Sequence, residues 1–123
     1  MQATAPLKIL RCFLLNGEKR NFKRVDLNTP VRYQIRGTPD YGNTLTDNIS
    51  EAGLAMNIDS FIPPSTPVMM EVNILNRVLH PLGIARWCQP IPHSSGNRMG
   101  IEFVEFDPLE RKYLRDFINM KSV

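Results

Sequence analysis

Apolar and polar residues alternate in short runs along most of the chain, and turn-forming residues separate these runs. In the first run, Val31, Tyr33 and Ile35 fall on one side of a strand, with Arg32 and Gln34 on the other. Similar runs occupy five further ranges, 44–49, 54–58, 68–75, 82–88 and 99–106. Most of the ten prolines and seven glycines lie between the runs. The spacing predicts about six strands in a small barrel or sandwich.

The same alternation predicts which side chains enter the core. In the second run we expect Leu45 and Ile49 to face inward, after a turn-rich connection over residues 37–43. The apolar side of the run at 68–75 consists of Val68, Met70, Val72 and Ile74.

After residue 106 the alternation gives way to a helical repeat. Asp107 is suited to the N-cap, Pro108 to the first helical position, and Glu110 to the third position of a capping box. The apolar stripe of this segment consists of Leu109, Tyr113, Leu114, Phe117, Ile118 and Met120. We therefore predict a C-terminal helix that packs on the strands.

The length of 123 residues corresponds to one domain. We expect this domain over residues 17–123, preceded by an extension over residues 1–16 that is packed on it or flexible. No apolar run is long enough to span a membrane. The apolar stretch 7–15 contains charges and has no basic segment before it, which favours a packed strand or short helix over a signal peptide. We therefore expect a cytoplasmic protein without membrane insertion.

Cysteine and histidine usage indicates neither a disulfide framework nor a metal site. Cys12 and Cys88 are the only cysteines, and we interpret them as free thiols in a reducing compartment. His80 and His93 are the only histidines, and no cluster has the spacing of zinc ligands. Ser50 has no sequence cue nearby for a histidine–carboxylate pair. We predict no metal, no cofactor and no catalytic residue, hence no enzyme.

The net charge of +3 is unevenly distributed along the chain. Residues 1–36 contain eight basic and two acidic residues, whereas the rest of the chain contains seven basic and ten acidic ones. Positive charge therefore gathers near the N-terminus. This pattern favours a local anion site over a broad nucleic-acid surface, although a solvated basic segment would give the same charge count.

The basic segment contains an arginine pair, Arg20 and Arg24, just before the first clear strand. Guanidinium groups donate two parallel hydrogen bonds, which suits a phosphate or the O6/N7 edge of guanine. On an extended or irregular segment, arginines four residues apart can reach around a compact ligand. Taken alone, the pair is more often a set of solvated charges.

A second motif, Asn48-x-Ser50-x-x-Gly53, lies between the second and third runs. An ordinary turn would explain it, because Asn and Ser bond to nearby backbone and Gly allows a positive φ. The same residues also suit a ligand: Asn48 can meet the polar edge of a base, and Ser50 can bond a phosphate or hold the loop. Gly53 would keep a side chain out of the pocket.

Together, Arg20-x-x-x-Arg24 and Asn48-x-Ser50-x-x-Gly53 resemble the two motifs of the PilZ domain family, written R-x-x-x-R and (Asp/Asn)-x-Ser-x-x-Gly. The strand at 99–104 and the C-terminal helix also resemble the end of that domain. The resemblance covers about residues 17–120.

The resemblance implies a mainly β fold, a six-stranded antiparallel barrel with a C-terminal helix, which binds the bacterial second messenger cyclic di-GMP. Arg20 and Arg24 would hold its phosphates and guanines, and Asn48, Ser50 and Gly53 would form the complementary surface on the barrel. Lys19 precedes the first arginine, a position that influences whether one or two nucleotides bind in the family, so both stoichiometries remain open.

Three functions stay open at this point. The first is a cyclic di-GMP receptor whose arginine segment becomes ordered on binding and which signals to an unidentified protein partner. The second is a PilZ-like interaction adaptor that binds no nucleotide. The third is a barrel for single-stranded nucleic acid, which the localised charge and the core-like spacing of the aromatic residues disfavour, so we expect no DNA or RNA partner. The role of Trp87 also stays open: the residue could belong to the core or be an anchor for a partner.

Overall fold

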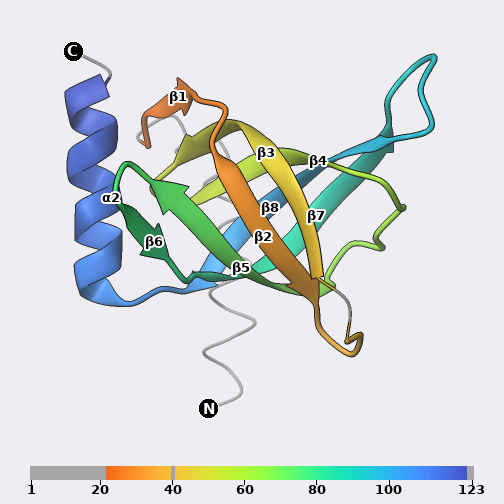
Figure 1. Cartoon of the computed structure of the whole chain (residues 1–123), viewed down its shortest axis with the longest axis horizontal. Helices are drawn as coiled ribbons and strands as arrows, with labels where there is room; N and C mark the ends of the chain where they lie inside the picture. The colour runs from red at the N-terminus through yellow and green to blue at the C-terminus, as the bar shows by residue number, and fades with distance from the viewer. Residues whose placement is uncertain (1–21, 40, 122–123) are drawn as a thin grey trace.

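The computed structural model describes residues 22–39 and 41–121. Over these residues eight strands precede one helix (Figure 1). They are β1 (Arg24–Asp26), β2 (Pro30–Ile35), β3 (Tyr41–Ser50), β4 (Gly53–Ile58), β5 (Pro67–Ile74), β6 (Arg77–Leu79), β7 (Leu82–Pro90), β8 (Asn97–Glu105) and α2 (Pro108–Lys121). The predictions for the extension over residues 1–16, for Cys12, for Lys19 and for Arg20 concern positions outside this range.

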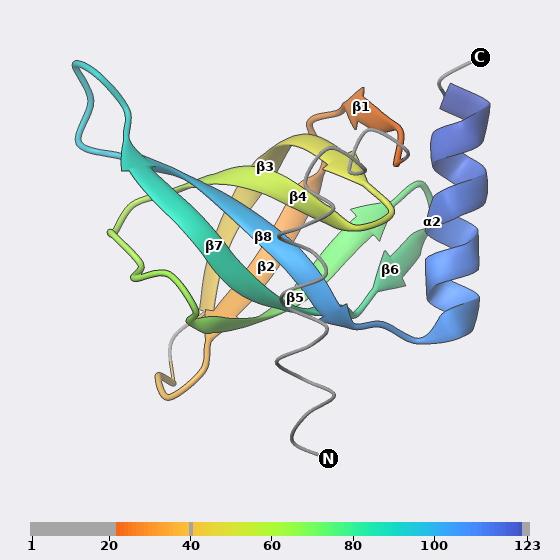
Figure 2. The same ribbon diagram turned by 180° about the vertical axis from the view of Figure 1, so that it is seen from behind.

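Six of the strands close into an antiparallel barrel, which confirms the predicted fold (Figures 1 and 2). Their order is β3-β2-β5-β7-β8-β4, and β4 pairs again with β3. The two extra strands are β1, which pairs with β3, and β6, which pairs with β5. Each has only three residues, too few to show an alternating pattern in the sequence.

Aliphatic and methionine side chains from all six barrel strands fill the interior. The predicted inward face of β5 is confirmed, since Val68, Met70, Val72 and Ile74 are all buried. Ile49 is buried as expected. This interior leaves the outer faces of the strands available to hold polar groups.

The expectation that Leu45 faces inward is wrong. Leu45 is 52% exposed, and Thr46 is buried in its place. The cause is a β-bulge: the pairing of β3 with β4 passes from Thr46↔Met56 to Asn48↔Ala55, so Asp47 is an extra residue on β3. The alternation therefore shifts by one residue along the strand, and Leu45 and Ile49 end on opposite faces although they are four residues apart.

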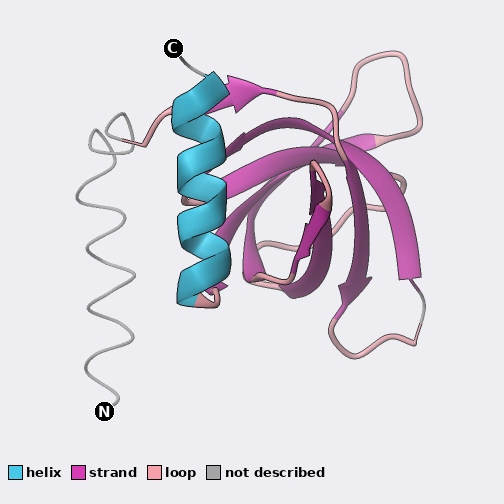
Figure 3. Cartoon of the chain, turned by 60° about the vertical axis from the view of Figure 1, so that its left-hand side comes forward, coloured by secondary structure: helices cyan, strands magenta, loops and turns pink. Residues whose placement is uncertain are grey.

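Helix α2 packs beside the barrel through its middle turns, where Leu114, Phe117 and Ile118 are buried (Figure 3). The predicted stripe is wrong at both ends, because Leu109 and Met120 lie in the first and last turns and are exposed. Within the described part of the chain, no helix is long and apolar enough to cross a membrane.

The N-cap of α2 is as predicted, but the capping box is not. Asp107 Oδ2 accepts hydrogen bonds from the backbone N–H groups of Leu109 and Glu110, both at 3.1 Å. The Glu110 carboxylate is used elsewhere: Oε1 accepts the backbone N–H of His80 at 2.7 Å, and Oε2 lies 3.1 Å from Nδ1 of the same histidine. Glu110 therefore ties the start of α2 to the corner between β6 and β7.

Candidate functional site

The short strand β1 brings Arg24 of the first motif to the second motif. It pairs with the end of β3 in the register Arg24↔Ser50 and Asp26↔Asn48. Across this pair, Arg24 Nη1 donates a hydrogen bond of 2.5 Å to Asn48 Oδ1, although the two residues are 24 positions apart in sequence. The structure thus joins Arg24 to the second motif directly. Arg20, the other predicted arginine, lies outside the described residues.

Ser50 holds the turn of the second motif. Its side chain is buried, and Oγ accepts the backbone N–H of Ala52 at 3.1 Å and donates to the carbonyl of Gly53 at 3.4 Å. The sequence predicted that this hydroxyl either bonds a phosphate or holds the loop, and in this structure it holds the loop.

Gly53 is required by a close approach between strands, not by a positive φ. Among the described glycines only Gly37 has a positive φ. A Cβ built on Gly53 would lie 2.1 Å from the backbone oxygen of Ile101, on the neighbouring strand β8. A side chain here would push β4 and β8 apart, so the glycine keeps the motif turn seated on the barrel.

The site continues from Asn48 across the outer face of the barrel. Asn48, Ala55, Gly100 and Trp87 occupy directly paired positions on β3, β4, β8 and β7. Ala55 and Gly100, in the middle of the row, are both buried, and Ala55 is only 3% exposed. A Cβ on Gly100 would lie 2.3 Å from the Trp87 ring, which shows that the indole lies flat over this glycine.

Charged side chains flank the row. Arg98 Nε donates to Asp47 Oδ2 at 2.6 Å, and the same guanidinium lies 5.9 Å from the centre of the Trp87 ring. Arg86 Nε donates to Glu102 Oε1 at 2.7 Å. Sequence reasoning missed this row, because its members come from four strands and only the register of the sheet makes them neighbours.

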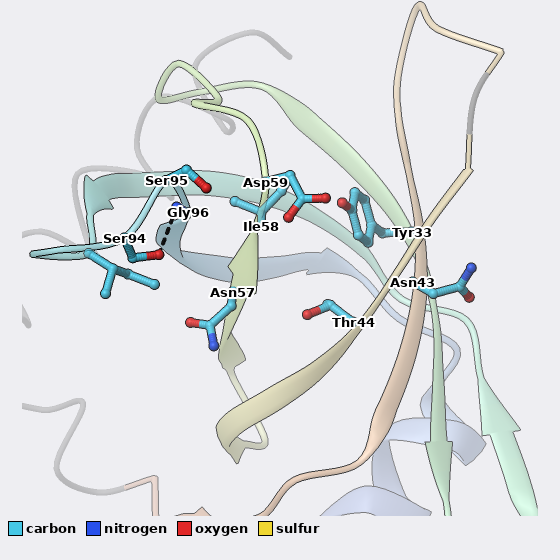
Figure 4. Close-up of a pocket in the computed structure, with 10 residues that line it drawn as sticks. Tyr33, Asn43, Thr44, Asn57, Ile58, Asp59, Ser94, Ser95 and Gly96 are labelled. Carbon is cyan, nitrogen blue, oxygen red and sulfur yellow. Dashed lines mark hydrogen bonds between the residues drawn. The ribbon is translucent and has the colours of Figure 1, made fainter.

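A separate polar pocket lies near the other end of β3 (Figure 4). Its volume is about 260 Å³. Its lining comprises Tyr33, Asn43, Thr44, Asn57, Ile58, Asp59, Ile91, Ser94, Ser95 and Gly96. Burial, and secondarily the charge of Asp59, raises the pKa of Tyr33 above its ordinary value of 10.0. The lining contains a carboxylate and no basic side chain, so it does not suit a phosphate ligand.

No described residues form a metal-binding cluster. Within residues 22–39 and 41–121, no three His, Cys, Asp or Glu side chains come together at a distance suitable for a metal ion. The groups that the described site offers to a ligand are the Asn48 amide, the Trp87 indole and the guanidinium groups beside them.

The described chain is thus a small closed antiparallel barrel in which Arg24, on a short added strand, is bonded to an Asn-x-Ser-x-x-Gly turn. The family model of the PilZ domain matches residues 18–120 of this chain. The protein belongs to the PilZ domain family. No curated protein matches the sequence significantly.

Several solved structures resemble the fold, among them a PilZ domain. The inhibitor of motility of Bacillus subtilis, MotI/DgrA, has 18% sequence identity and a TM-score of 0.74 over 84% of this chain and 51% of that chain. The PilZ domain of YcgR from Escherichia coli, solved with c-di-GMP, has 13% identity and a TM-score of 0.64 over 85% and 92% of the two chains. The K. pneumonia MrkH–c-di-GMP complex has 11% identity and a TM-score of 0.62 over 84% and 51%. This chain thus spans about half the length of two of these proteins.

Proposed function

We propose that this protein is a cyclic di-GMP receptor of the bacterial cytoplasm, with the ligand held by Arg20 and Arg24 on one side and by Asn48, Ser50 and Gly53 on the other. The hydrogen bond between Arg24 and Asn48 carries the proposal, because it joins an arginine of the first motif to the asparagine of the second. Two similar structures, those of YcgR and MrkH, are c-di-GMP complexes, which supports the same ligand class here.

The ligand chemistry agrees with the groups at this surface. Cyclic di-GMP carries two phosphates and two guanines, and the arginine fork binds both kinds of group in a bidentate manner. Asn48 offers an amide for the polar edge of a base. Trp87, at the far end of the same outer row, offers a face on which a guanine can stack. Recognition of this kind needs no catalytic step.

We further propose that binding orders the arginine segment and thereby changes the surface that a partner protein meets. The ligand would bridge this segment to the barrel, as the Arg24–Asn48 bond already does at one point. Amide hydrogen exchange over residues 17–26 tests the idea, since exchange should slow when cyclic di-GMP is added. Equal exchange with and without the nucleotide would refute the ordering step and leave the binding proposal intact.

Thermal unfolding with three ligands tests the binding itself. Cyclic di-GMP at about 100 times its dissociation constant should stabilise the protein by roughly 2.7 kcal/mol. GMP and a single-stranded oligonucleotide should give no comparable shift. The double substitution Arg20→Ala/Arg24→Ala should abolish the shift, whereas Arg36→Ala, an exposed arginine in the turn after β2, should retain it.

The same measurement separates the alternatives. No shift with cyclic di-GMP would favour a PilZ adaptor that acts without nucleotide. A shift with the oligonucleotide alone would favour a nucleic-acid barrel. A cyclic di-GMP shift that survives Arg20→Ala/Arg24→Ala would mean that the ligand binds elsewhere.

A further inference from the structure

The turn of the second motif is bonded to helix α2 through Glu51, the residue after Ser50. Glu51 Oε2 accepts a hydrogen bond from Arg111 Nε at 3.2 Å and another from Arg115 Nε at 3.1 Å. Arg111 and Arg115 are one helical turn apart, so both guanidiniums reach the same carboxylate oxygen. The motif turn and α2 therefore share one charged cluster of three side chains.

This cluster carries more positive charge than its carboxylate balances. Two guanidiniums meet one carboxylate, which leaves a net charge of +1. The Glu51 side chain is only 17% exposed, whereas those of Arg111 and Arg115 are 44% and 47% exposed. Both bonds use Nε, so within the described part of the chain the Nη edge of each fork remains for another acceptor. The excess charge is therefore presented toward solvent next to the motif.

Anchoring of helix α2 to the motif turn does not explain why a second arginine bonds Glu51. One guanidinium suffices to pair one carboxylate, and a second one on the same oxygen adds repulsion between the cations. Arg111 also lies in the first turn of α2, where the helix dipole disfavours positive charge. Lys112 on the same helix shows an ordinary arrangement, since it forms a one-to-one pair with Asp116 at 2.9 Å.

The cluster lies close to the predicted ligand contacts. Arg24 pairs in register with Ser50, and Glu51 is the next residue along the chain. Helix α2 contacts both β1 and β3. Arg24 and the Arg111/Arg115 pair therefore belong to the same end of the barrel, around the turn that joins β3 to β4.

We propose that Arg111 and Arg115 are a second phosphate-binding pair of this site, which contacts a ligand phosphate while Glu51 holds the two side chains in position. This inference rests on the proposed cyclic di-GMP function. Glu51 then has an opposing effect on affinity, because its charge competes with the phosphate for the same arginines. Ligand binding would also connect the motif turn to α2, through groups that neither family motif contains.

Calorimetric titration with cyclic di-GMP, at low and at physiological salt, tests the pair. Arg111→Gln and Arg115→Gln should each weaken binding about tenfold, as expected for a charge-assisted hydrogen bond. The double variant should also reduce the salt dependence of the affinity. Lys112→Gln is the matched control, since it removes an exposed cation from the same helix, and its affinity should equal that of the wild type. Thermal unfolding without ligand shows whether each variant is folded.

The substitution Glu51→Gln distinguishes a ligand pair from an anchor by the sign of its effect. Glutamine keeps a hydrogen-bond acceptor for the arginines but removes the competing charge, so affinity should rise roughly threefold. In the Arg111→Gln/Arg115→Gln background the same change should give a smaller gain, because no pair remains to be released. Weaker binding by Glu51→Gln, or an equal gain in both backgrounds, would overturn the proposal.

The outcomes also separate this inference from the proposed function. If the wild type binds cyclic di-GMP and the Arg111→Gln/Arg115→Gln protein binds equally well, only the second pair is refuted. If the folded wild type shows no binding heat at all, the receptor function and the pair are both refuted.

Discussion

Substitution of Gly53 by alanine tests whether this motif glycine is needed for packing rather than for ligand contact. The added Cβ would lie 2.1 Å from the Ile101 oxygen and 3.2 Å from the Glu102 Cα, both of which are backbone atoms. A flexible side chain could move aside, but here β4 and β8 would have to separate over a stretch that pairs continuously from Gly53↔Glu102 to Ile58↔Asn97. We therefore expect a loss of stability in the protein without ligand.

The size of this loss follows from two opposing effects. Overpacking against fixed neighbours costs about 1–3 kcal/mol. The smaller conformational entropy of the unfolded alanine chain returns about 0.4–1 kcal/mol. A contact this short and this rigid belongs at the upper end of the cost, which leaves a net loss of roughly 2 kcal/mol. For a domain of this size, the unfolding midpoint should fall by roughly 6–10 °C.

The assay is thermal and urea unfolding without ligand, with Gly96→Ala as the matched control. Gly96 has no positive φ, and a Cβ there would meet its nearest neighbour, Ser94 Oγ, at an ordinary 3.5 Å. Gly96→Ala should therefore leave stability unchanged or raise it by up to about 1 kcal/mol. If Gly53→Ala proved as stable as Gly96→Ala yet lost cyclic di-GMP binding, the packing explanation would be refuted and direct ligand contact would replace it.

Three further predictions concern the core, the outer row and the pocket. Thr46→Val should lower the free energy of unfolding in urea by about 1–3 kcal/mol, because the buried hydroxyl accepts the Thr29 N–H at 3.0 Å and donates to the Leu27 carbonyl. Thr38→Val, at an exposed turn, is the control. An equal loss in that control would contradict the structural role of the Thr46 hydroxyl. Trp87 is the only tryptophan, so its fluorescence should change on titration with cyclic di-GMP if a guanine stacks on it. The substitution Trp87→Ala should weaken binding by roughly tenfold. Unchanged emission at saturation would exclude stacking. The raised pKa of Tyr33 means that the native state favours the neutral phenol, so its contribution to stability is complete below pH 10 and is lost as the pH rises through the folded-state pKa. Tyr33→Phe should flatten this loss in urea unfolding between pH 9 and 11, and an unaltered slope would show that another group titrates.

The barrel could be predicted because its strands alternate cleanly, as β5 does from Val68 to Ile74. Where local geometry departs from the alternation, sequence reasoning failed. The extra residue Asp47 placed Leu45 outside, and the bonds from His80 drew Glu110 away from the helix N-terminus. Neither effect has a local signal: the bulge depends on how β3 pairs with β4, and the Glu110 contact depends on His80, 30 residues earlier in the chain.

The residues of the candidate site also differ in whether the sequence could predict them. The motifs of Arg24 and Asn48 could be paired from the sequence by their resemblance to a family, and the structure supplies the register and the bond between them. Trp87 could not be assigned to this surface without the register of four strands. The link from Glu51 to Arg111 and Arg115 spans 60 and 64 residues, and no spacing rule predicts it.

The bulge at Asp47 has a consequence for how the chain length of this domain can vary. Removing Asp47 would restore regular alternation from Thr46 to Asn48, with Thr46 still inside and Asn48 still outside. Removing Thr46 or Asn48 would also restore the alternation, but it would place Asp47 in the buried position of Thr46 or on the outer face in place of the Asn48 amide. Of these three positions, only position 47 can lose its residue while the strand keeps both the buried Thr46 hydroxyl and the outward Asn48 amide. In an alignment of related sequences, a one-residue gap just before the Asn-x-Ser-x-x-Gly motif is the expected trace of this tolerance.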